Sequence, residues 1–164
     1  IAAFDVTELV HDLINSSGIL IQQNAAKVSV DMPETLVVMG DEFKIEEVVT
    51  NYLTNAMNHL GGDHNIRIWS ETLDGVAKIH VYNNGTPIPE EDLPNLWTKF
   101  YKVDKARTRA YGGSGIGLSI VKAIMEAHHQ QYGVVNHEDG VEFWFTLALA
   151  SEEPEEEEQR EENS

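Results

Sequence analysis

Residues 41–60 read DEFKIEEVVTNYLTNAMNHL, the longest helical pattern in the chain. Apolar side chains recur there every three or four residues over about five turns, which indicates one helix face packed on a core. They are Ile45, Val48, Val49, Tyr52, Leu53, Ala56, Met57 and Leu60. Beside that face lies a polar row at intervals of four, formed by Glu47, Asn51, Asn55 and His59. A solvated helix face is the commoner explanation of such a row, so the row by itself assigns no function.

The segments on either side of this helix favour strands. Gly61 and Gly62 end the helix, and residues 66–72 and 76–82 then form two strands around the turn Asp74-Gly75. Upstream, residues 27–31 and 36–39 are expected to form a hairpin across Met32-Pro33-Glu34. Before them, a helix with Thr7 as its N-cap is expected to reach residues 22–26.

The C-terminal half contains a long loop, a helix and two strands. Residues 83–114 are rich in turns, prolines and basic side chains, with a short helical passage near 92–100. Loops of this length usually are functional lids or disordered segments. A helix with Ile120, Val121, Ile124 and Met125 facing inward follows, and residues 133–136 and 141–149 complete the sheet.

Length and composition favour one domain followed by a tail. A chain of 164 residues with 41% hydrophobic content can bury one core, which we expect in residues 1–150. Residues 151–164 are acidic and free of aromatic residues, so we expect them to be disordered.

Charge and targeting signals exclude several classes of partner. The net charge is −17, and removing the eight Glu and one Arg between Glu152 and Glu162 still leaves −10. This charge disfavours direct contact with nucleic acid or an anionic membrane, because both require positive potential. The chain has no cysteine, no leader pattern and no apolar stretch long enough to span a bilayer. We therefore expect a soluble, cytoplasmic domain.

A glycine-rich segment opens the second long helix. Residues 113–118 read GSGIGL, and such glycines expose backbone amides at a helix N-terminus, where phosphate is stabilised. The pattern matches neither the Walker P-loop nor the dinucleotide fingerprint. A plain turn that joins loop to helix is the alternative.

A third segment connects these motifs. Residues 81–88 read VYNNGTPI, a strand that runs into a turn rich in amide side chains. In this order, the polar helix row, this turn and the glycine segment resemble the N, G1 and G2 boxes of the ATPase superfamily of gyrases, mismatch-repair ATPases, folding chaperones and histidine kinases. Residues 96–104, LWTKFYKVD, resemble the F box and lid of the histidine-kinase branch. The resemblance extends from about Phe4 to Leu149.

This resemblance implies a fold, a ligand and a site. The fold is the α+β, two-layer α/β sandwich, with a mixed, largely antiparallel sheet, helices on one face and a long ATP lid. The ligand is Mg-ATP, with Asn51 as the magnesium ligand and Asn55 on the phosphates or on metal-bound water. Glu47 stands at the position of a general base, and Lys102 with Lys99 replaces lid arginines that reach the phosphates. The implied nucleotide-binding set is Asn51, Asn55, His59, Asn83, Gly85, Ile88, Lys99, Phe100, Tyr101, Lys102, Gly113, Ser114, Gly115, Ile116, Gly117 and Leu118.

Four positions depart from the family pattern. Asn83 replaces the aspartate that accepts from the adenine amino group, and because an amide can flip, discrimination against guanine should weaken. Pro87 replaces a common glycine, Asn58 a common lysine, and Val141 a threonine that often supports the adenine site. Nucleotide binding is still expected.

The implied partners are the helical dimerisation and phosphoacceptor hairpin of a membrane-anchored parent kinase and, downstream, a response regulator. His11-Asp12-Leu13 superficially resembles a phosphoacceptor box, but no proline follows and the segment belongs to the first helix, so the acceptor is expected outside this chain. Two alternatives stay open: a nucleotide-binding module with little or no kinase activity, and an autonomous ATPase or serine kinase of the anti-sigma type.

Overall fold

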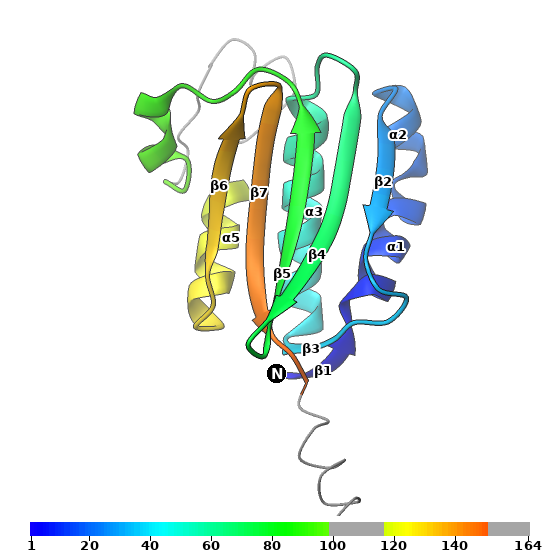
Figure 1. Ribbon diagram of the computed structural model, residues 1–164, viewed down its shortest axis with the longest axis vertical. Helices are drawn as coiled ribbons and strands as arrows, with labels where there is room; N and C mark the ends of the chain where they lie inside the picture. The colour runs from blue at the N-terminus through cyan, green and yellow to red at the C-terminus, as the bar shows by residue number, and fades with distance from the viewer. Residues whose placement is uncertain (99–116, 151–164) are drawn as a thin grey trace, which may run out of the picture.

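The computed structural model describes residues 1–98 and 117–150 (Figure 1). The described helices are α1 Val6–Ser16, α2 Gly18–Gln23, α3 Glu42–Asn58, the 3-10 helix η1 Glu90–Asn95 and α5 Gly117–Ala127. The described strands are β1 Ala2–Asp5, β2 Lys27–Asp31, β3 Val37–Gly40, β4 Asn65–Leu73, β5 Val76–Asn84, β6 Tyr132–His137 and β7 Gly140–Ala148. Within these residues, no helix combines the length and the apolar character needed to cross a bilayer.

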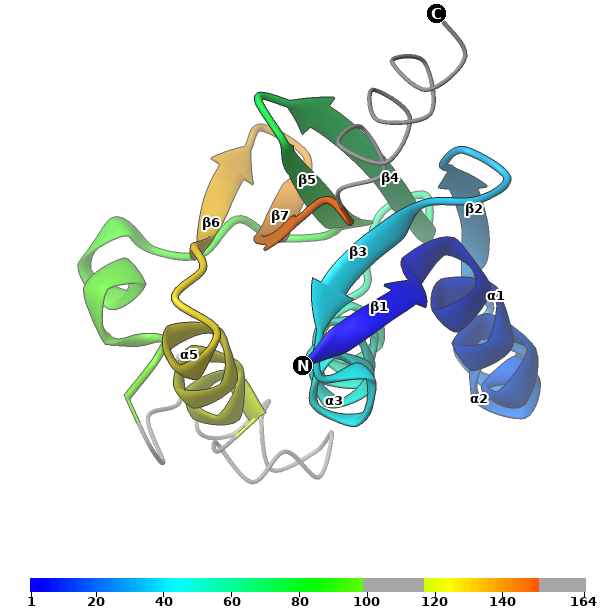
Figure 2. The same ribbon diagram turned by 90° about the horizontal axis from the view of Figure 1, so that it is seen from below.

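The main sheet has five strands in the order β2-β4-β5-β7-β6. The pair β2 and β4 is parallel, and the other three pairs are antiparallel. Seen from below, α1, α3 and α5 all lie on one side of this sheet (Figure 2). The two-layer α+β fold with a mixed, largely antiparallel sheet is therefore confirmed.

Helix α3 forms the centre of the core between the two layers. Its apolar stripe is buried as predicted, apart from Leu60, which lies beyond the helix and is half-buried. Tyr52 packs against Phe143 with the ring centroids 5.3 Å apart, and its hydroxyl donates to the Trp144 carbonyl at 3.0 Å. These contacts hold the apolar face of α3 against β7, and the polar row therefore lies beside that buried face.

The expected hairpin between residues 27–31 and 36–39 is wrong. β2 pairs with β4 in parallel, and β3 pairs with β1 in a separate antiparallel two-stranded sheet. The Asp5 carboxylate at the end of β1 accepts from the Leu36 amide at 3.0 Å, which holds the start of β3 beside β1. α3 then supplies the long crossover that a parallel pair needs.

The first helical region also differs from expectation. Asp5, not Thr7, is the N-cap of α1, since its carboxylate accepts from the amides of Thr7 and Glu8. The expected single helix is divided into α1 and α2 at Ser17, which leaves the helical conformation just before Gly18. The short helical passage expected near residues 92–100 corresponds in part to the 3-10 helix η1, which begins at Glu90 and ends at Asn95, while residues 99 and 100 lie outside the described residues.

Candidate functional site

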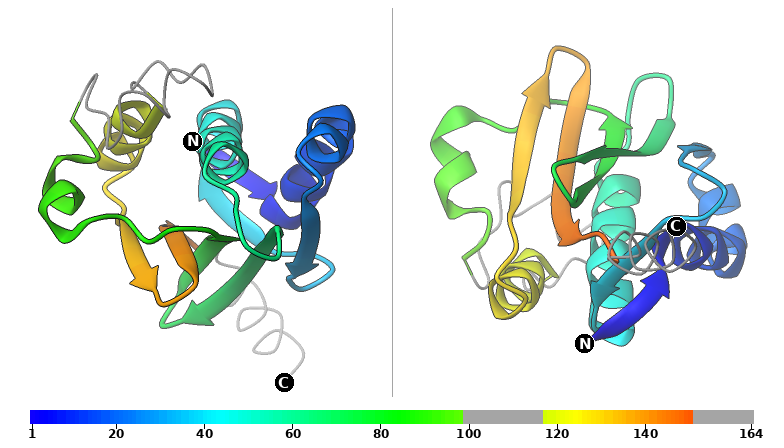
Figure 3. Two further views of the ribbon diagram at one scale, coloured as in Figure 1. Left: turned by 90° about the horizontal axis from the view of Figure 1, so that it is seen from above. Right: turned by 60° about the horizontal axis from the view of Figure 1, so that its bottom comes forward.

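The polar row of α3 meets the first turn of α5. α3 and α5 run side by side in the helix layer, as the view from above shows (Figure 3). A Cβ placed on Gly117 would lie 2.9 Å from Oδ1 of Asn51, which is closer than real Cβ contacts come. The missing side chain of Gly117 therefore lets the Asn51 amide lie against the N-terminus of α5.

The Asn51 amide has a defined orientation. Its Nδ2 donates to the Glu47 carbonyl one turn earlier at 2.8 Å, so Oδ1 is the end near Gly117. An amide oxygen is a hard ligand of the kind magnesium takes, and magnesium needs few protein ligands because it keeps several waters. The oxygen that Asn51 presents at this position would therefore suit a magnesium ion.

The other members of the row lie one turn before Asn51 (Glu47) and one and two turns after it (Asn55 and His59). Glu47 is exposed, with its carboxylate 3.6 Å from the Lys44 ammonium, and Asn55 is half-buried. His59 is the C-cap of α3 and has an exposed side chain. From Asn51 to His59 the row covers about 12 Å along the helix axis.

The end of β5 closes the far end of the row. Asn83 is 2% exposed, and its Nδ2 donates to the carbonyls of Asn84 at 3.0 Å and His59 at 3.4 Å. Because Nδ2 of Asn83 donates to two carbonyl oxygens, the orientation of the side-chain amide is fixed and Oδ1 points away from those carbonyls. The residue is buried and oriented, whereas the sequence left its amide free to flip.

Gly85 is required by the same close approach. Its φ of +155° is a backbone conformation that residues with a side chain rarely adopt. A Cβ on Gly85 would also collide with the carbonyl oxygen of His59. The turn after β5 therefore packs its backbone directly on the end of α3. Across the sheet, Val141 stands opposite Asn83 and is 3% exposed, so this position offers no hydroxyl.

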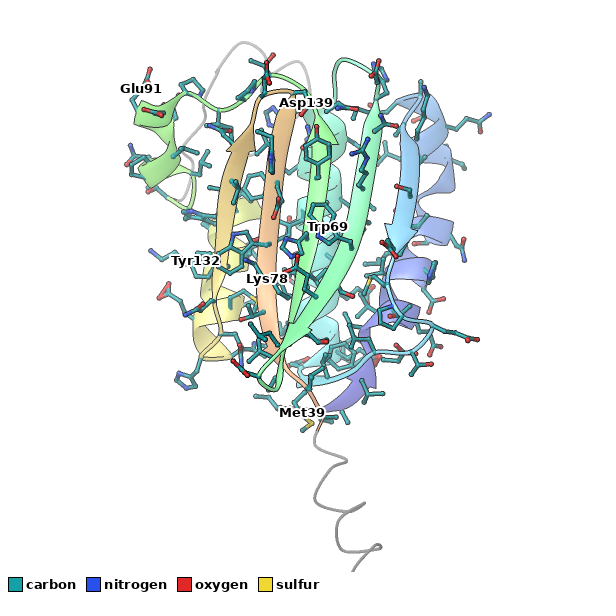
Figure 4. All side chains as sticks on the ribbon, viewed as in Figure 1. Met39, Trp69, Lys78, Glu91, Tyr132 and Asp139 are labelled. Atoms are coloured by element: carbon teal, nitrogen blue, oxygen red, sulfur yellow. The ribbon has the colours of Figure 1, made fainter. Side chains whose placement is uncertain are left out.

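The β6–β7 hairpin holds the loop that follows β5, and sequence reasoning missed this. The Gly85 amide donates to the Asp139 carbonyl at 3.0 Å, and the side chain of Asn136 exchanges two hydrogen bonds with the backbone of Ile88. Figure 4 shows Asp139 at the end of the sheet where this loop begins. One signal was available: Asn136 is a polar residue in register with the core residue Val141.

Asn84 and Tyr82 face the opposite side of the sheet. The Tyr82 hydroxyl donates to the Asp139 carboxylate at 2.8 Å and accepts from Asn84 Nδ2 at 3.0 Å. Burial, followed by the Asp139 hydrogen bond, raises the pKa of Tyr82. Asn84 Oδ1 accepts from the Asn65 amide, so Asn84 joins β5 to β4 and does not face α3.

Half of the implied nucleotide-binding set lies outside the described residues. These positions are Lys99, Phe100, Tyr101, Lys102, Gly113, Ser114, Gly115 and Ile116. Of the described members, Gly117 and Leu118 open α5, with Leu118 partly buried against the core. Within residues 1–98 and 117–150, no group of three or more His, Asp or Glu side chains has the arrangement of a metal centre.

Comparison with known proteins places this geometry in context. A family model described as "Histidine kinase-, DNA gyrase B-, and HSP90-like ATPase" matches residues 40–151. The sensor protein VanSB of Enterococcus faecalis is 33% identical over 90% of this chain, and the phosphate regulon sensor protein PhoR of Haemophilus influenzae is 31% identical over 88%. The chain covers 33% and 34% of those two proteins, so it spans about a third of their length.

Solved structures agree with the sequence comparisons. The catalytic domain of histidine kinase ThkA superposes with a TM-score of 0.80 at 28% identity, and the alignment covers 90% of this chain and 95% of that one. ThkA in complex with the response regulator TrrA superposes with a TM-score of 0.76 at 27% identity, covering 93% of this chain and 42% of that one.

Proposed function

The chain belongs to the family of histidine kinase-, DNA gyrase B- and HSP90-like ATPases, and from this we propose that it is the ATP-binding catalytic domain of a two-component sensor histidine kinase. It donates the γ-phosphate of ATP to a histidine in a dimerisation hairpin outside residues 1–164. The parent protein is membrane-anchored, with this domain on the cytoplasmic side, and a response regulator is its downstream partner. The catalytic domain comprises residues 1–150, and residues 151–164 are a separate acidic tail.

The observation that carries the proposal is the contact between Asn51 and Gly117. The oriented amide oxygen of Asn51 lies at the N-terminus of α5, where backbone amides and the helix dipole favour phosphate. An acidic chain with a charge of −17 needs such local compensation to bind an anionic nucleotide. A bound magnesium ion supplies further charge neutralisation at the phosphates.

Each residue of the row then has its own task. Asn51 would hold the magnesium ion through its amide oxygen, and Asn55 would form a hydrogen bond with a phosphate oxygen or a metal-bound water. Asn83, at the far end, accepts from the purine amino group through Oδ1, because its nitrogen is engaged by two carbonyls. Glu47 is exposed and accessible to an incoming imidazole as a proton acceptor. Lys99 and Lys102 would neutralise the β- and γ-phosphates from the lid.

A titration with nucleotides tests the binding site. ATP, ADP and GTP are titrated with and without magnesium into the parent chain, Asn51→Ala and Thr50→Ala, with Thr50 an exposed α3 residue outside the polar row. Asn51→Ala should weaken magnesium-dependent ATP binding about tenfold, which corresponds to ~1.4 kcal/mol. Thr50→Ala should match the parent. Equal affinities in all three proteins would remove Asn51 from the site.

Phosphotransfer tests the enzymatic part. The full-length protein's histidine hairpin is mixed with this chain and ATP labelled at the γ-phosphate, and acid-labile phosphohistidine is measured. The kinase proposal expects label on the hairpin. Nucleotide binding without label would favour the non-enzymatic binding module, and steady phosphate release by this chain alone would favour the autonomous ATPase.

A further inference from the structure

The loop between β5 and η1 is attached to the β6–β7 hairpin at both of its ends. At the first end, the Gly85 amide donates to the Asp139 carbonyl at 3.0 Å. At the second, the Ile88 amide donates to Asn136 Oδ1 at 3.0 Å, and Asn136 Nδ2 donates to the Ile88 carbonyl at 2.7 Å. A single side chain thus pairs with both polar groups of one residue, as a neighbouring β-strand would.

The prolines on either side explain why a side chain makes this pair. Pro87 and Pro89 have no amide hydrogen, so the segment Thr86–Pro89 cannot form a continuous ladder with β6. Ile88 is the residue between them that offers both a donor and an acceptor. Asn136 belongs to the edge strand β6, and its carboxamide has the same donor and acceptor as a peptide group.

The anchored loop borders the proposed nucleotide site. It begins two residues after Asn83, and Gly85 packs against the His59 carbonyl at the end of α3. Beyond η1, Trp97 packs edge-on against Tyr132 of β6 and Phe143 of β7, with centroid distances of 4.8 and 5.8 Å. The chain between Gly85 and Trp97 is therefore held along the β6–β7 hairpin before it enters residues 99–116.

We propose that Asn136 is a positioning residue that sets the wall of the nucleotide pocket by clamping the backbone of Ile88. The inference rests on the proposed function for its ligand. It concerns ground-state binding of the nucleotide, because the side-chain hydrogen bonds of Asn136 go to the Ile88 backbone, whereas the phosphates would bind at the contact between Asn51 and Gly117. Loss of the clamp frees the loop between Gly85 and Ile88, and the purine then loses one side of its pocket.

Three variants of the full chain separate the parts of the clamp. Asn136→Ala removes both hydrogen bonds, whereas Asn136→Asp keeps the acceptor for the Ile88 amide and loses the donor. Val135→Ala is the matched control on the same strand, since Val135 is 41% exposed and faces the other side of the sheet. Hydrogen exchange of the Ile88 amide is measured without nucleotide, and the affinity for Mg-ATP is measured separately.

The expected results follow from these contacts. Asn136→Ala should speed exchange of the Ile88 amide at least tenfold and leave the amides of β7 as in the parent. Asn136→Asp should exchange at an intermediate rate. Mg-ATP should bind Asn136→Ala about tenfold more weakly, and with the histidine hairpin added, KM for ATP should rise while kcat at saturating ATP stays within twofold.

Several outcomes would overturn the inference. The first is an Ile88 amide that exchanges in Asn136→Ala at the same rate as in the parent. The second is an Asn136→Ala chain that binds Mg-ATP as tightly as a parent that binds ATP. The third is faster exchange of the amides throughout β7 in Asn136→Ala, which would show a general loss of stability. A parent chain that binds no nucleotide would instead overturn the proposed function, so the two failures are distinguishable.

Discussion

At the scale of single residues, the absent side chain of Gly117 determines where the Asn51 amide can lie. A Cβ at residue 117 would come within 2.9 Å of Asn51 Oδ1, so Gly117→Ala should push that oxygen away from the start of α5. We expect magnesium-dependent ATP binding to weaken about tenfold, measured by calorimetric titration. The helix itself should persist, because alanine is a better helix former than glycine.

A control for this substitution exists in the same chain. Gly18 at the start of α2 has no atom within 4 Å of an added Cβ, so Gly18→Ala should leave nucleotide binding as in the parent. If Gly117→Ala binds ATP as tightly as Gly18→Ala does, Asn51 does not depend on the gap at Gly117.

Sequence reasoning named the candidate site residues and missed the residues that hold them in position. Asn51 and Gly117 were named from their motifs, and the structure brings them into contact. The orientation of Asn83 depends on the His59 carbonyl, 24 residues earlier in the chain, and no local pattern encodes that contact. Asn136 likewise acts on a backbone segment 48 residues away.

At the scale of elements, the Asp5 carboxylate joins three of them. Its Oδ1 at the end of β1 caps α1 through Thr7 and also accepts from Leu36 ahead of β3, both at 3.0 Å. Asp5→Ala removes an N-cap and leaves the Leu36 amide without its partner. We expect a loss of about 2 kcal/mol in the free energy of unfolding, measured by urea denaturation.

The neighbouring acidic residue Glu8 is the control for this substitution. Glu8 is exposed on the first turn of α1, so Glu8→Ala should cost about 0.5 kcal/mol through the helix dipole. Equal losses for the two variants would mean that Asp5 acts only through its charge and that its hydrogen bonds contribute nothing.

The elements themselves were largely predictable, and their pairing was less so. The period of residues 41–60 identified α3, and the turn Asp74-Gly75 identified the β4–β5 hairpin, which the structure confirms. β2 and β3 were assigned to each other because they are adjacent in sequence. Their true partners, β4 and β1, depend on the crossover through α3 and on the contact between Asp5 and Leu36, which are long-range features.

At the scale of the whole molecule, the helices cover one face of the sheet and long side chains cover the other (Figures 2 and 4). On that second face, Trp69 stacks on His80 at 4.6 Å, and His80 Nδ1 lies 2.6 Å from the Glu142 carboxylate. The Lys78 ammonium lies 4.2 Å from the centre of the Trp144 ring. Within residues 1–98 and 117–150, this face buries the polar side chains of His80 and Glu142 without a second layer of helices. Tyrosines are buried on both faces, with Tyr52 on the helix side and Tyr82 on the other.

Burial of tyrosines makes the stability of the whole domain sensitive to alkaline pH. Desolvation by burial is the main cause that raises the pKa of Tyr52, Tyr82 and Tyr132, and for Tyr52 the pKa lies well above its ordinary value. Above pH ~10 the unfolded chain releases phenolic protons that the folded chain retains. The unfolded state then binds fewer protons, so the free energy of unfolding falls as pH rises through the folded pKa values.

Tyr52→Phe isolates the contribution of the fully buried tyrosine. At pH 7 the variant should lose about 1 kcal/mol, because the hydroxyl no longer donates to the Trp144 carbonyl. Above pH ~10 the free energy of unfolding of the variant should fall less steeply with pH than that of the parent. The two slopes should differ by up to ~1.4 kcal/mol per pH unit, the value for one proton. Urea unfolding between pH 8 and 11 measures how the free energy of unfolding of each protein depends on pH.

Phe43→Tyr is the control, since residue 43 is 79% exposed and a tyrosine there titrates alike in the folded and unfolded states. A Tyr52→Phe curve parallel to the parent's above pH ~10 would show that the buried hydroxyl does not govern the alkaline loss of stability.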